Sequence, residues 1–567
     1  MRIRGCMIAA CALLAAGEAH AEVTAARGMV VTTSGTGAAA AGLEALKKGG
    51  TAMDAAMTAA VMQPCLAAGS YVSYAGIIYV VYFDAASGKV FNLSSGFNTV
   101  LGETEPLTIP GIDMAAAAAG DLKSFGSKPS GRTALVPGFF AGVEAAHRRF
   151  GKRPFADILA PAIRCAGQGF TLTPELAWAM NWREAVLRRL PETRAIFTKP
   201  DGKLYAAGEL FRQPALAQTL REISKRGVMP YIYRGDWGRR FVAAVQAEGG
   251  RMTQADLDAY LPTWIEPAHA RFNGFDVYAQ GLPSLGGVSL VESLNLATAA
   301  NLVALPPYRE SPLKLFWQLQ FAKLGNFLGA PGVAPQMEKA LGADLSPQGR
   351  LKPETAMRLW KLLEAGQIPS LPAPRMATTA HSDAIVTVDE RGNVAAVTHT
   401  INTVNWGSTG IFVGGISIPD AASFQQPVIA TLKPGSRLPD STAPGIALKD
   451  GKPALGFSSI GSGLLVRTLG ALLDTLGHGM SPEQAIASPA HGGFDYSKAA
   501  SGEIGALVGV GEFKPEYLEQ LKGLGQVTRE DDAQRGYWIG VAIDPGSPRL
   551  RGATLREMKI GGAVAGY

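Results

Sequence analysis

The sequence predicts an α+β fold, because helical regions and strand hairpins occupy different parts of the chain. Apolar residues recur at helical spacing from Pro137 to about Ala270 and again from Arg309 to Leu363. Strand-like runs separated by turn residues occupy 384–401 and 445–457. With 567 residues, of which 47% are hydrophobic and 18% charged, the chain can bury a large core, which excludes a disordered protein.

The first segment of the chain has the features of a signal peptide. Arg2 and Arg4 precede an apolar run, which ends in the small-x-small pattern Ala19-His20-Ala21. We therefore expect removal of residues 1–21 and export to the periplasm or the medium. A membrane span needs about 20 apolar residues, and this run is too short. A lipid anchor on Cys11 is the alternative.

The mature chain is expected to open with a helical pair followed by a hairpin. Ala38 to Lys48 contains good helix formers and stops at Gly49-Gly50, and Asp54 to Met62 restarts the helical pattern. Ile77 to Phe83 is a continuous apolar and aromatic run, followed by the turn-like residues 85–88. Such a run is typical of a strand in a buried hairpin.

A connector separates the helical regions from the strand-rich part of the chain. Residues 365–379 contain Pro369, Pro372 and Pro374, so we expect an exposed segment without regular structure. The first hairpin after it begins almost at Ser382.

The second hairpin, 445–457, leads into a turn of small residues. Residues 458–463 are expected to form this turn, and 464–476 the apolar helix that follows it. A turn before a helix N-terminus leaves backbone N–H groups that point at one place. The motif Gly461-Ser462-Gly463 lies in no nucleotide-binding pattern, so we do not expect a phosphate site.

Charge and cysteine content exclude several classes of function. The net charge of +6 is spread along the chain, which argues against nucleic-acid binding. The histidines are isolated and no Cys-x-x-Cys occurs, so we expect no metal and no other cofactor. After export only Cys65 and Cys165 remain, and whether they form a disulfide stays open.

Four sequence blocks, in this order, resemble the γ-glutamyltranspeptidase (glutathione hydrolase) family. They are residues 28–56; TALVPGFFAG with RFGKRPFADILAPAIRCAGQGF; GGRMTQADLDAY with the turn 283–287; and HSDAIVTVDERGNVAAVTHTINT, residues 381–403. The resemblance implies the four-layer αββα sandwich of N-terminal-nucleophile hydrolases. It also implies a precursor that cuts itself and an enzyme that transfers an acyl group from a small amide to water or an amine.

The same resemblance places the nucleophile on Ser382. A gap-free match to the family pattern puts this residue where the family has threonine. A serine suffices, because the mechanism needs a β-hydroxyl at a chain N-terminus whose α-amine, with a pKa of about 8, acts as the base. Cleavage after His381 would give a large subunit, 22–381, and a small subunit, 382–567. His381 either assists this cleavage or is a solvated loop residue.

An alternative position for the nucleophile stays open. Thr378 or Thr379 would be the family threonine if the chain carried a local insertion.

Further roles follow from the resemblance alone. Thr400 matches the residue that hydrogen-bonds the nucleophile, and Asn402 matches a substrate contact. Gly461 and Ser462 match the two backbone N–H donors of the oxyanion hole, where the family usually has two glycines. Each donor of this kind is worth about 3 kcal/mol of transition-state stabilisation.

The expected substrate pocket departs from the family pattern. Ser94 stands near the position of the arginine that binds the γ-glutamyl carboxylate, and Ser423 near that of the aspartate that holds the amine. Of two adjacent serines only Ser441 is kept, with Asp440 in the other place. Each lost charged contact is worth about 1.5–3 kcal/mol. We therefore expect an amide other than γ-glutamyl, such as a dicarboxylate or aromatic acyl amide. An unprocessed binding protein on the same scaffold is the alternative function.

Overall fold

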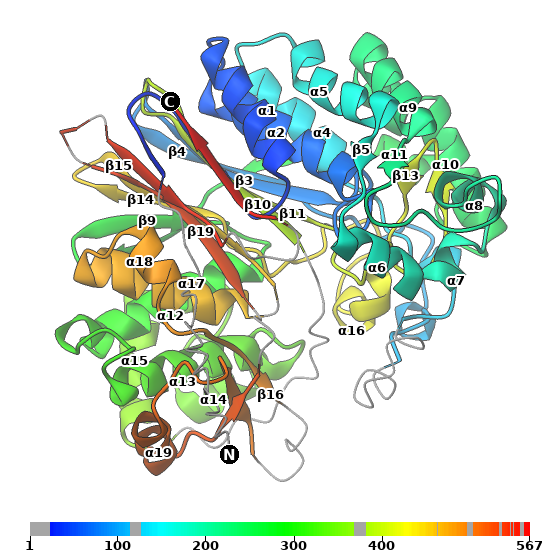
Figure 1. Cartoon of the computed structure of the whole chain (residues 1–567). Coiled ribbons are helices and arrows are strands. Elements are labelled where there is room, and N and C mark those ends of the chain that lie inside the picture. Colours follow the sequence, from blue (N-terminus) through cyan, green and yellow to red (C-terminus); the bar gives the residue numbers. More distant parts are fainter. Residues whose placement is uncertain are drawn as a thin grey trace, which may run out of the picture.

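The computed structural model describes residues 23–113, 126–367, 382–461, 463–495, 503–531, 536–544, 546–547, 549–555 and 561–567. Two seven-stranded sheets pack face to face, and helices cover the outer face of each (Figure 1). This arrangement confirms the predicted α+β class and the four-layer αββα sandwich.

The first sheet carries the candidate nucleophile in its centre. Its order is β21-β2-β10-β11-β3-β4-β7. The strands are β2 (Met29–Thr32), β3 (Ile77–Asp84), β4 (Lys89–Ser95), β7 (Thr263–Ile265), β10 (Ser382–Val388), β11 (Val394–Thr400) and β21 (Ala563–Gly566). Both faces of β10 and β11 are buried along their whole length. The strands nevertheless contain six polar residues, most of them at the end of the hairpin where β10 begins: Ser382, Asp383, Thr387, Thr398, His399 and Thr400.

The second sheet has the order β1-β20-β19-β15-β14-β9-β8. Its strands are β1 (Val23–Ala25), β8 (Ala268–Phe272), β9 (Phe275–Ala279), β14 (Gly445–Lys449), β15 (Lys452–Ile460), β19 (Tyr537–Ile543) and β20 (Leu550–Ala553). Each sheet combines strands from before residue 368 with strands from after residue 381. A chain cut between these parts would therefore remain joined by the hydrogen bonds of both sheets.

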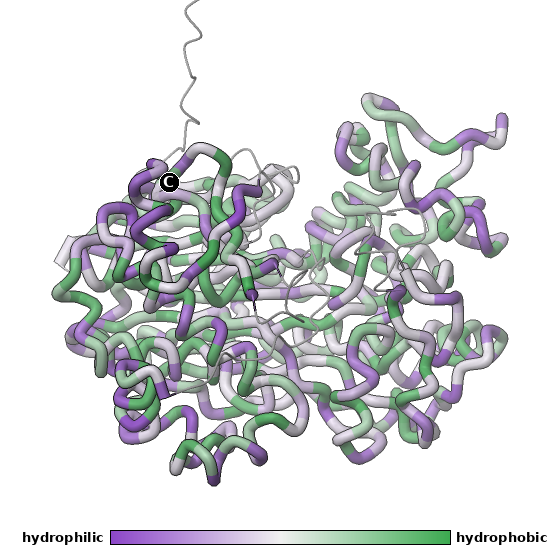
Figure 2. The backbone as a smooth tube through the Cα atoms, turned by 90° about the horizontal axis from the view of Figure 1, so that it is seen from below, coloured by the Kyte–Doolittle hydropathy of each residue, from purple (hydrophilic) through white to green (hydrophobic). Residues whose placement is uncertain are grey.

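Helices form the two outer layers (Figure 1). Against the first sheet lie α1 (Thr36–Lys47), α2 (Ala52–Leu66) and α4 (Phe139–Phe150). On the same side of the molecule lie α5 (Phe155–Gln168), α9 (Pro214–Arg226) and α10 (Asp236–Ala247). On the side of the second sheet lie α12 (Leu285–Ala299), α13 (Pro312–Leu328), α14 (Val333–Leu341), α15 (Pro353–Glu364), α17 (Leu464–Leu472) and α18 (Pro482–Ile486). Hydrophilic and hydrophobic residues alternate along the outer segments (Figure 2), as expected where one face of a helix meets solvent.

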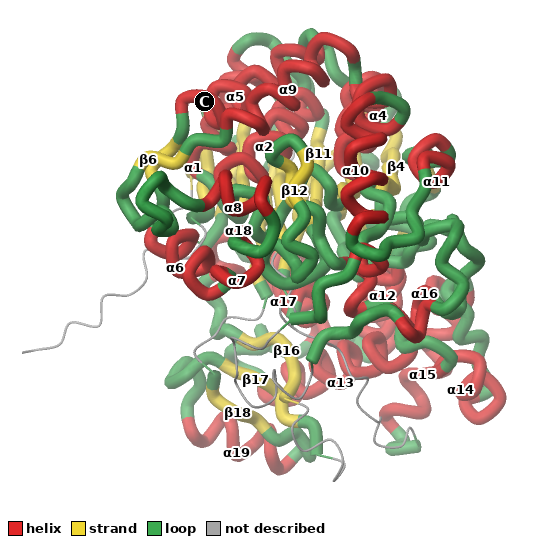
Figure 3. The backbone as a smooth tube through the Cα atoms, turned by 90° about the vertical axis from the view of Figure 1, so that its right-hand side faces the viewer, coloured by secondary structure: helices red, strands yellow, loops and turns green. Residues whose placement is uncertain are grey.

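Smaller elements extend the sandwich at two places. A three-stranded sheet of β16 (His491–Asp495), β17 (Gly505–Val508) and β18 (Thr528–Glu530) lies beside α19 (Pro515–Gly523), apart from the main sheets (Figure 3). Short helices α6 (Pro174–Trp182), α7 (Glu184–Leu187) and α8 (Pro191–Phe197) pack with the two-stranded sheet β5 (Phe170–Thr171) and β6 (Leu210–Phe211). The remaining short helices are α11 (Gln254–Asp258) and α16 (Gln426–Ile429).

The structure corrects two expectations about secondary structure. The region 137–270 is not helical to its end, because residues from Thr263 onward form β7 and β8. Ser458 and Ser459 do not form a turn: β15 continues to Ile460, and these residues pair with Ile539 and Trp538 of β19. Pairing with a neighbouring strand outweighs the weak strand preference of serine.

A buried ion pair joins the helices under the second sheet. Arg350 donates from Nε and Nη2 to the carboxylate of Glu292 on α12, at 2.9 and 2.7 Å. Nη2 also contacts Ser289 Oγ at 3.1 Å and the carbonyl of Gly325 on α13 at 3.3 Å. Both ionic side chains are 1% exposed. This bidentate geometry satisfies the charges that the fold removes from water.

The two mature-chain cysteines lie in the helical layer above the first sheet. Cys65 of α2 and Cys165 of α5 are buried free thiols that contact one another. Burial raises the pKa of the Cys65 thiol, and the neighbouring Cys165 adds to the effect. A disulfide between them stays an open expectation.

Within the described part of the chain, no helix combines the length and the hydropathy needed to cross a bilayer. The expected signal peptide lies outside the described residues. So do residues 368–381, which include most of the expected connector together with Thr378, Thr379 and His381.

Candidate active site

Ser382 is the first residue of β10 and points into the sandwich. Side chains alternate between the two faces of a strand, so Ser382 shares its face with Ala384 and Val386, which lie in the core between the sheets. Ser382 is 7% exposed. Its partner in the antiparallel register is Thr400, the last residue of β11. Side chains directly opposite one another have Cβ atoms about 4.5–5.5 Å apart, so the two hydroxyl-bearing residues are neighbours.

Thr400 and Asn402 close the end of this hairpin. The Thr400 hydroxyl accepts a hydrogen bond from the backbone N–H of Asn402 at 3.0 Å. Asn402 has a φ of 52°, in the left-handed region that asparagine tolerates better than most residues. The backbone thus turns sharply after β11, and the Asn402 side chain reaches Asp440.

The end of β15 lies across the sandwich from the same hairpin end. Ser458 Oγ is 2.8 Å from Thr398 Oγ1, and a side chain at Gly456 would meet Val386 and Val394. β15 and β11 therefore run in the same direction, so Gly461 follows β15 at the end where Thr400 lies. Gly461 has a φ of +91°, which explains why glycine stands there. Ser462 lies outside the described residues, and its predicted oxyanion role stays a prediction.

Asp440 lies next to Asn402 at this end of the fold. Its Oδ2 accepts a hydrogen bond from Asn402 Nδ2 at 2.5 Å. Its backbone carbonyl accepts from Ser284 Oγ and from the N–H of Leu285, both at 2.8 Å. Ser441, predicted to face the substrate, is exposed. A side chain at Gly286 would come within 2.0 Å of the Ser441 carbonyl, so this turn requires glycine.

Ser94 and Ser423 also belong to this end of the first sheet. Ser94 of β4 pairs with Tyr79 of β3, and the 3-10 turn η6 (Ala421–Phe424) carries Ser423 and packs on Ile77 and Tyr79. Both serines are at most 2% exposed, and their hydroxyls have no hydrogen-bond partner among the described residues. Neither side chain can replace the charge of the residue expected at its position.

Comparison with known proteins decides the family. Residues 38–564, most of the 567, match the model of the family described as Gamma-glutamyltranspeptidase. The chain belongs to the γ-glutamyltranspeptidase family. The predicted resemblance is therefore confirmed, and the chain is an amide-cleaving enzyme of the autoprocessing type. The alternative of an unprocessed binding protein is not favoured.

Relatives of this γ-glutamyltranspeptidase-family chain include hydrolases and acylases. A glutathione hydrolase proenzyme of Pseudomonas sp. (strain A14) is 28% identical over 497 residues, which cover 83% of this chain and 82% of that protein. An acylase ACY 1 proenzyme of Pseudomonas sp. (strain V22) is 26% identical over 484 residues, 82% of each protein. The crystal structure of cephalosporin acylase from Bacillus halodurans has the same fold, with a TM-score of 0.76 at 24% identity over 96% of this chain and 97% of that one.

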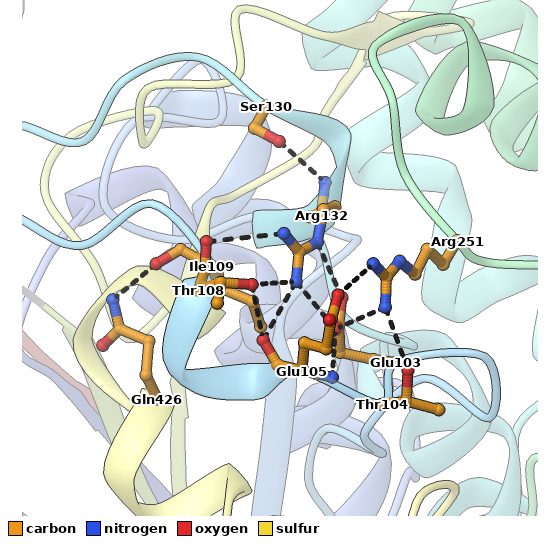
Figure 4. Close-up of polar contacts among 9 residues, drawn as sticks. All are labelled: Glu103, Thr104, Glu105, Thr108, Ile109, Ser130, Arg132, Arg251 and Gln426. Carbon is orange, nitrogen blue, oxygen red and sulfur yellow. Dashed lines mark hydrogen bonds and ion pairs between the residues drawn. The ribbon is translucent and has the colours of Figure 1, made fainter.

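An ion-pair network holds residues 103–109 beside α16 in this family member (Figure 4). The Glu103 carboxylate accepts hydrogen bonds from Arg132 Nε at 2.9 Å and Nη2 at 2.8 Å. Burial alone would raise the pKa of Glu103, but the hydrogen bonds from Arg132 and the backbone lower it below its usual value. Gln426 of α16 donates to the Ile109 carbonyl at 3.3 Å. The network fixes residues 103–109 against the short helices next to the site, and we assign it a structural role.

A polar pair that the sequence analysis missed lies on the opposite face of the nucleophile's hairpin. Asp383 and His399 are directly opposite in the register and are fully buried beneath α2. Asp383 Oδ1 accepts from Thr33 Oγ1 at 3.1 Å, and His399 Nε2 lies 2.7 Å from Gln63 Oε1. Burial raises the pKa of Asp383 to about 7, and burial lowers the pKa of His399 to about 3. The alternation of side chains along a strand could have located this pair, because the residue after Ser382 must point to the opposite face of the sheet.

The raised pKa of Asp383 predicts a pH-dependent stability. The folded protein keeps a proton that an unfolded aspartate, with a pKa of about 3.9, releases, so this group's contribution to the free energy of unfolding falls as pH rises from about 4 to about 7. The fall is at most about 4 kcal/mol. An Asp383→Asn variant cannot show this fall in stability, because asparagine does not titrate. His399 contributes the opposite slope, but equally in both proteins, so their difference isolates Asp383.

The measurement compares urea unfolding midpoints of wild type and Asp383→Asn at pH 5 and pH 8, with both proteins in the same processing state. The variant should gain stability relative to wild type at pH 8. A difference that does not change with pH would show that Asp383 titrates normally.

The predicted site residues thus gather at one end of the sandwich. Ser382, Thr400, Asn402 and Gly461 come from strand ends of the two facing sheets, and Ser94 and Ser423 lie around the start of β3. Thr378, Thr379, His381 and Ser462 lie outside the described residues, so the cleavage position is open to experiment.

Proposed function

We propose that Ser382 becomes the N-terminal nucleophile of this γ-glutamyltranspeptidase-family enzyme. The observation that carries the proposal is the pairing of Ser382 with Thr400, on the inner face of the sheet and at the end where Gly461 follows β15. A hydroxyl there has a threonine beside it that can orient it, and a turn on the facing sheet whose backbone N–H groups can stabilise an oxyanion.

Processing starts from the precursor. Ser382 Oγ attacks the carbonyl carbon of His381, the C–N bond breaks, and the acyl group moves from nitrogen to oxygen as an ester. Water hydrolyses the ester, which leaves a carboxylate on His381 and a free α-amine on Ser382. The products are residues 22–381, after removal of 1–21 during export, and residues 382–567. Interleaving of their strands in both sheets keeps the two subunits together.

Turnover uses the same hydroxyl. The α-amine of Ser382 accepts the proton of Oγ as Oγ attacks the amide carbonyl of the substrate, and the proton then passes to the leaving amine. Thr400 orients the hydroxyl, and the N–H groups of Gly461 and Ser462 stabilise the developing oxyanion. Water or an acceptor amine then resolves the acyl-enzyme on Ser382.

The acyl part of the substrate is bound by Asn402 and by the residues around it. Ser94 and Ser423 are buried hydroxyls in places where a γ-glutamyl site needs an arginine and an aspartate. Each replaced contact costs about 1.5–3 kcal/mol, so γ-glutamyl amides should be weak substrates. Ser441 contributes from the exposed rim.

Trapping of the acyl-enzyme tests the proposal. Purified two-chain protein is mixed with a panel of acyl p-nitroanilides, quenched in acid within one turnover, and analysed by intact mass and peptide mapping. We expect release of p-nitroaniline and an acyl adduct on Ser382 of the small chain. An adduct on another residue, or two-chain protein that releases no p-nitroaniline from any acyl group, would contradict the assignment.

A further inference from the structure

Asp440 is a buried carboxylate without a cationic partner. It is 7% exposed, and among the described residues it takes part in no ion pair. Its two oxygens accept hydrogen bonds from neutral donors, Asn402 Nδ2 at 2.5 Å and the backbone N–H of Thr442 at 2.7 Å. An ionised carboxylate in such surroundings is costly unless a positive charge is supplied.

The arginine near Asp440 in sequence does not supply this charge. Arg437 Nη1 donates to the Gly96 carbonyl at 2.5 Å and to the hydroxyl of Tyr260, and Nη2 donates to the Leu261 carbonyl at 2.6 Å. These bonds hold its guanidinium against β4 and the loop after α11. Burial raises the pKa of Asp440, which agrees with a carboxylate that lacks a compensating cation.

Asp440 lies within reach of the reacting centre. Asn402 bonds the Asp440 carboxylate through its side chain and the Thr400 hydroxyl through its backbone N–H, at 3.0 Å. Thr400 in turn is the register partner of Ser382. A single residue, Asn402, therefore links the Asp440 carboxylate to Thr400, the neighbour of the candidate nucleophile.

We propose that Asp440 binds an ammonium group on the acyl part of the substrate, so that the enzyme prefers amides of amine-bearing acids that lack a second carboxylate. This inference rests on the function proposed above, because it places the acyl group next to Ser382. A substrate ammonium replaces the missing cation of Asp440. A substrate carboxylate finds only the neutral hydroxyl of Ser94 where an arginine was expected, and Asp440 repels it. The dicarboxylate amides expected from the sequence are thus disfavoured.

Four p-nitroanilides that share the same leaving group separate the effect of a substrate ammonium from the effect of a substrate carboxylate. The 4-aminobutyryl anilide carries the ammonium alone, γ-glutamyl carries ammonium and carboxylate, glutaryl carries the carboxylate alone, and butyryl carries neither. The readout is the ratio of kcat/KM for 4-aminobutyryl to kcat/KM for butyryl, which does not depend on the amount of active enzyme. We expect 4-aminobutyryl to be the best substrate and glutaryl the worst.

Asp440→Asn should lower this ratio by about 10- to 100-fold, because a charge-assisted hydrogen bond becomes a neutral one. Asp450→Asn is the matched control, since Asp450 is an exposed aspartate in the turn between β14 and β15. If Asp440→Asn is not cut into two chains, Asp440→Ser, with the serine that the family has there, takes its place.

The outcomes distinguish this inference from the proposed function. A ratio that is unchanged in the Asp440 variant, a preference for glutaryl, or two-chain wild type that cleaves none of the four anilides would overturn the role of Asp440. The assignment of Ser382 would survive each of these results as long as two-chain wild type releases p-nitroaniline from another acyl group of the wider panel. Wild type that stays uncut and inactive would overturn both.

Discussion

Ser382→Ala is expected to remain a single chain after export and to lose amide cleavage by about 10⁶-fold, which is the scale of removing a serine nucleophile. Both effects follow from the proposed mechanism, in which the same hydroxyl attacks the His381 carbonyl in the precursor and the substrate carbonyl in the mature enzyme. The side chain is small and 7% exposed, and its loss leaves the β10–β11 register intact, so the variant should fold normally.

Ser382→Thr is the matched control, because it keeps a β-hydroxyl at the same position. It should still be cut and retain measurable activity. Thr378→Ala and Thr379→Ala should be cut like wild type. If Ser382→Ala is cut and active, or if either threonine variant blocks cleavage, Ser382 is not the nucleophile.

Arg350→Met is expected to destabilise the protein by about 3–5 kcal/mol, the scale of breaking one side of a buried ion pair. The loss arises from Glu292, whose carboxylate stays buried at 1% exposure without its cation. Urea unfolding of the variant in the single-chain Ser382→Ala background measures the effect without subunit dissociation.

Two controls show whether the loss of stability comes from the burial of the ion pair and from the charge left unpaired on Glu292. Lys352→Met removes a cation from an exposed pair with Asp344, whose side chains are 56% and 47% exposed, and should have little effect because water screens such a pair. The double variant Arg350→Met/Glu292→Leu removes both buried charges and should recover part of the loss. An Arg350→Met midpoint equal to that of Lys352→Met would show that the pair does not contribute to stability.

Local patterns predicted the elements that position the nucleophile. The alternating run after Ser382 and the turn at 390–393 fix a hairpin whose two strands differ little from the structure. The opening helical pair was also predicted: the expected helices Ala38 to Lys48 and Asp54 to Met62 lie within a few residues of α1 and α2. These features depend on neighbours in sequence, which is why the sequence alone suffices for them.

Features that depend on distant partners were not readable. Ser458 and Ser459 are small polar residues typical of a turn, yet β19, some 80 residues later in the chain, pairs with them as strand. Asp440 was noted only as a change from the family pattern, because its lack of a cation appears only once Asn402 and Arg437 are placed in space. Asp383 and His399 are two ordinary residues in sequence and a buried pair in the fold.

Intact mass and N-terminal sequencing of the purified wild-type protein test the central claim most directly. We predict two chains, a larger one that ends at His381 and a smaller one that begins with Ser382 and ends at Tyr567. A smaller chain that begins at Thr378 or Thr379 would move the nucleophile into the connector, and a single chain that nonetheless cleaves amides would contradict the mechanism as a whole.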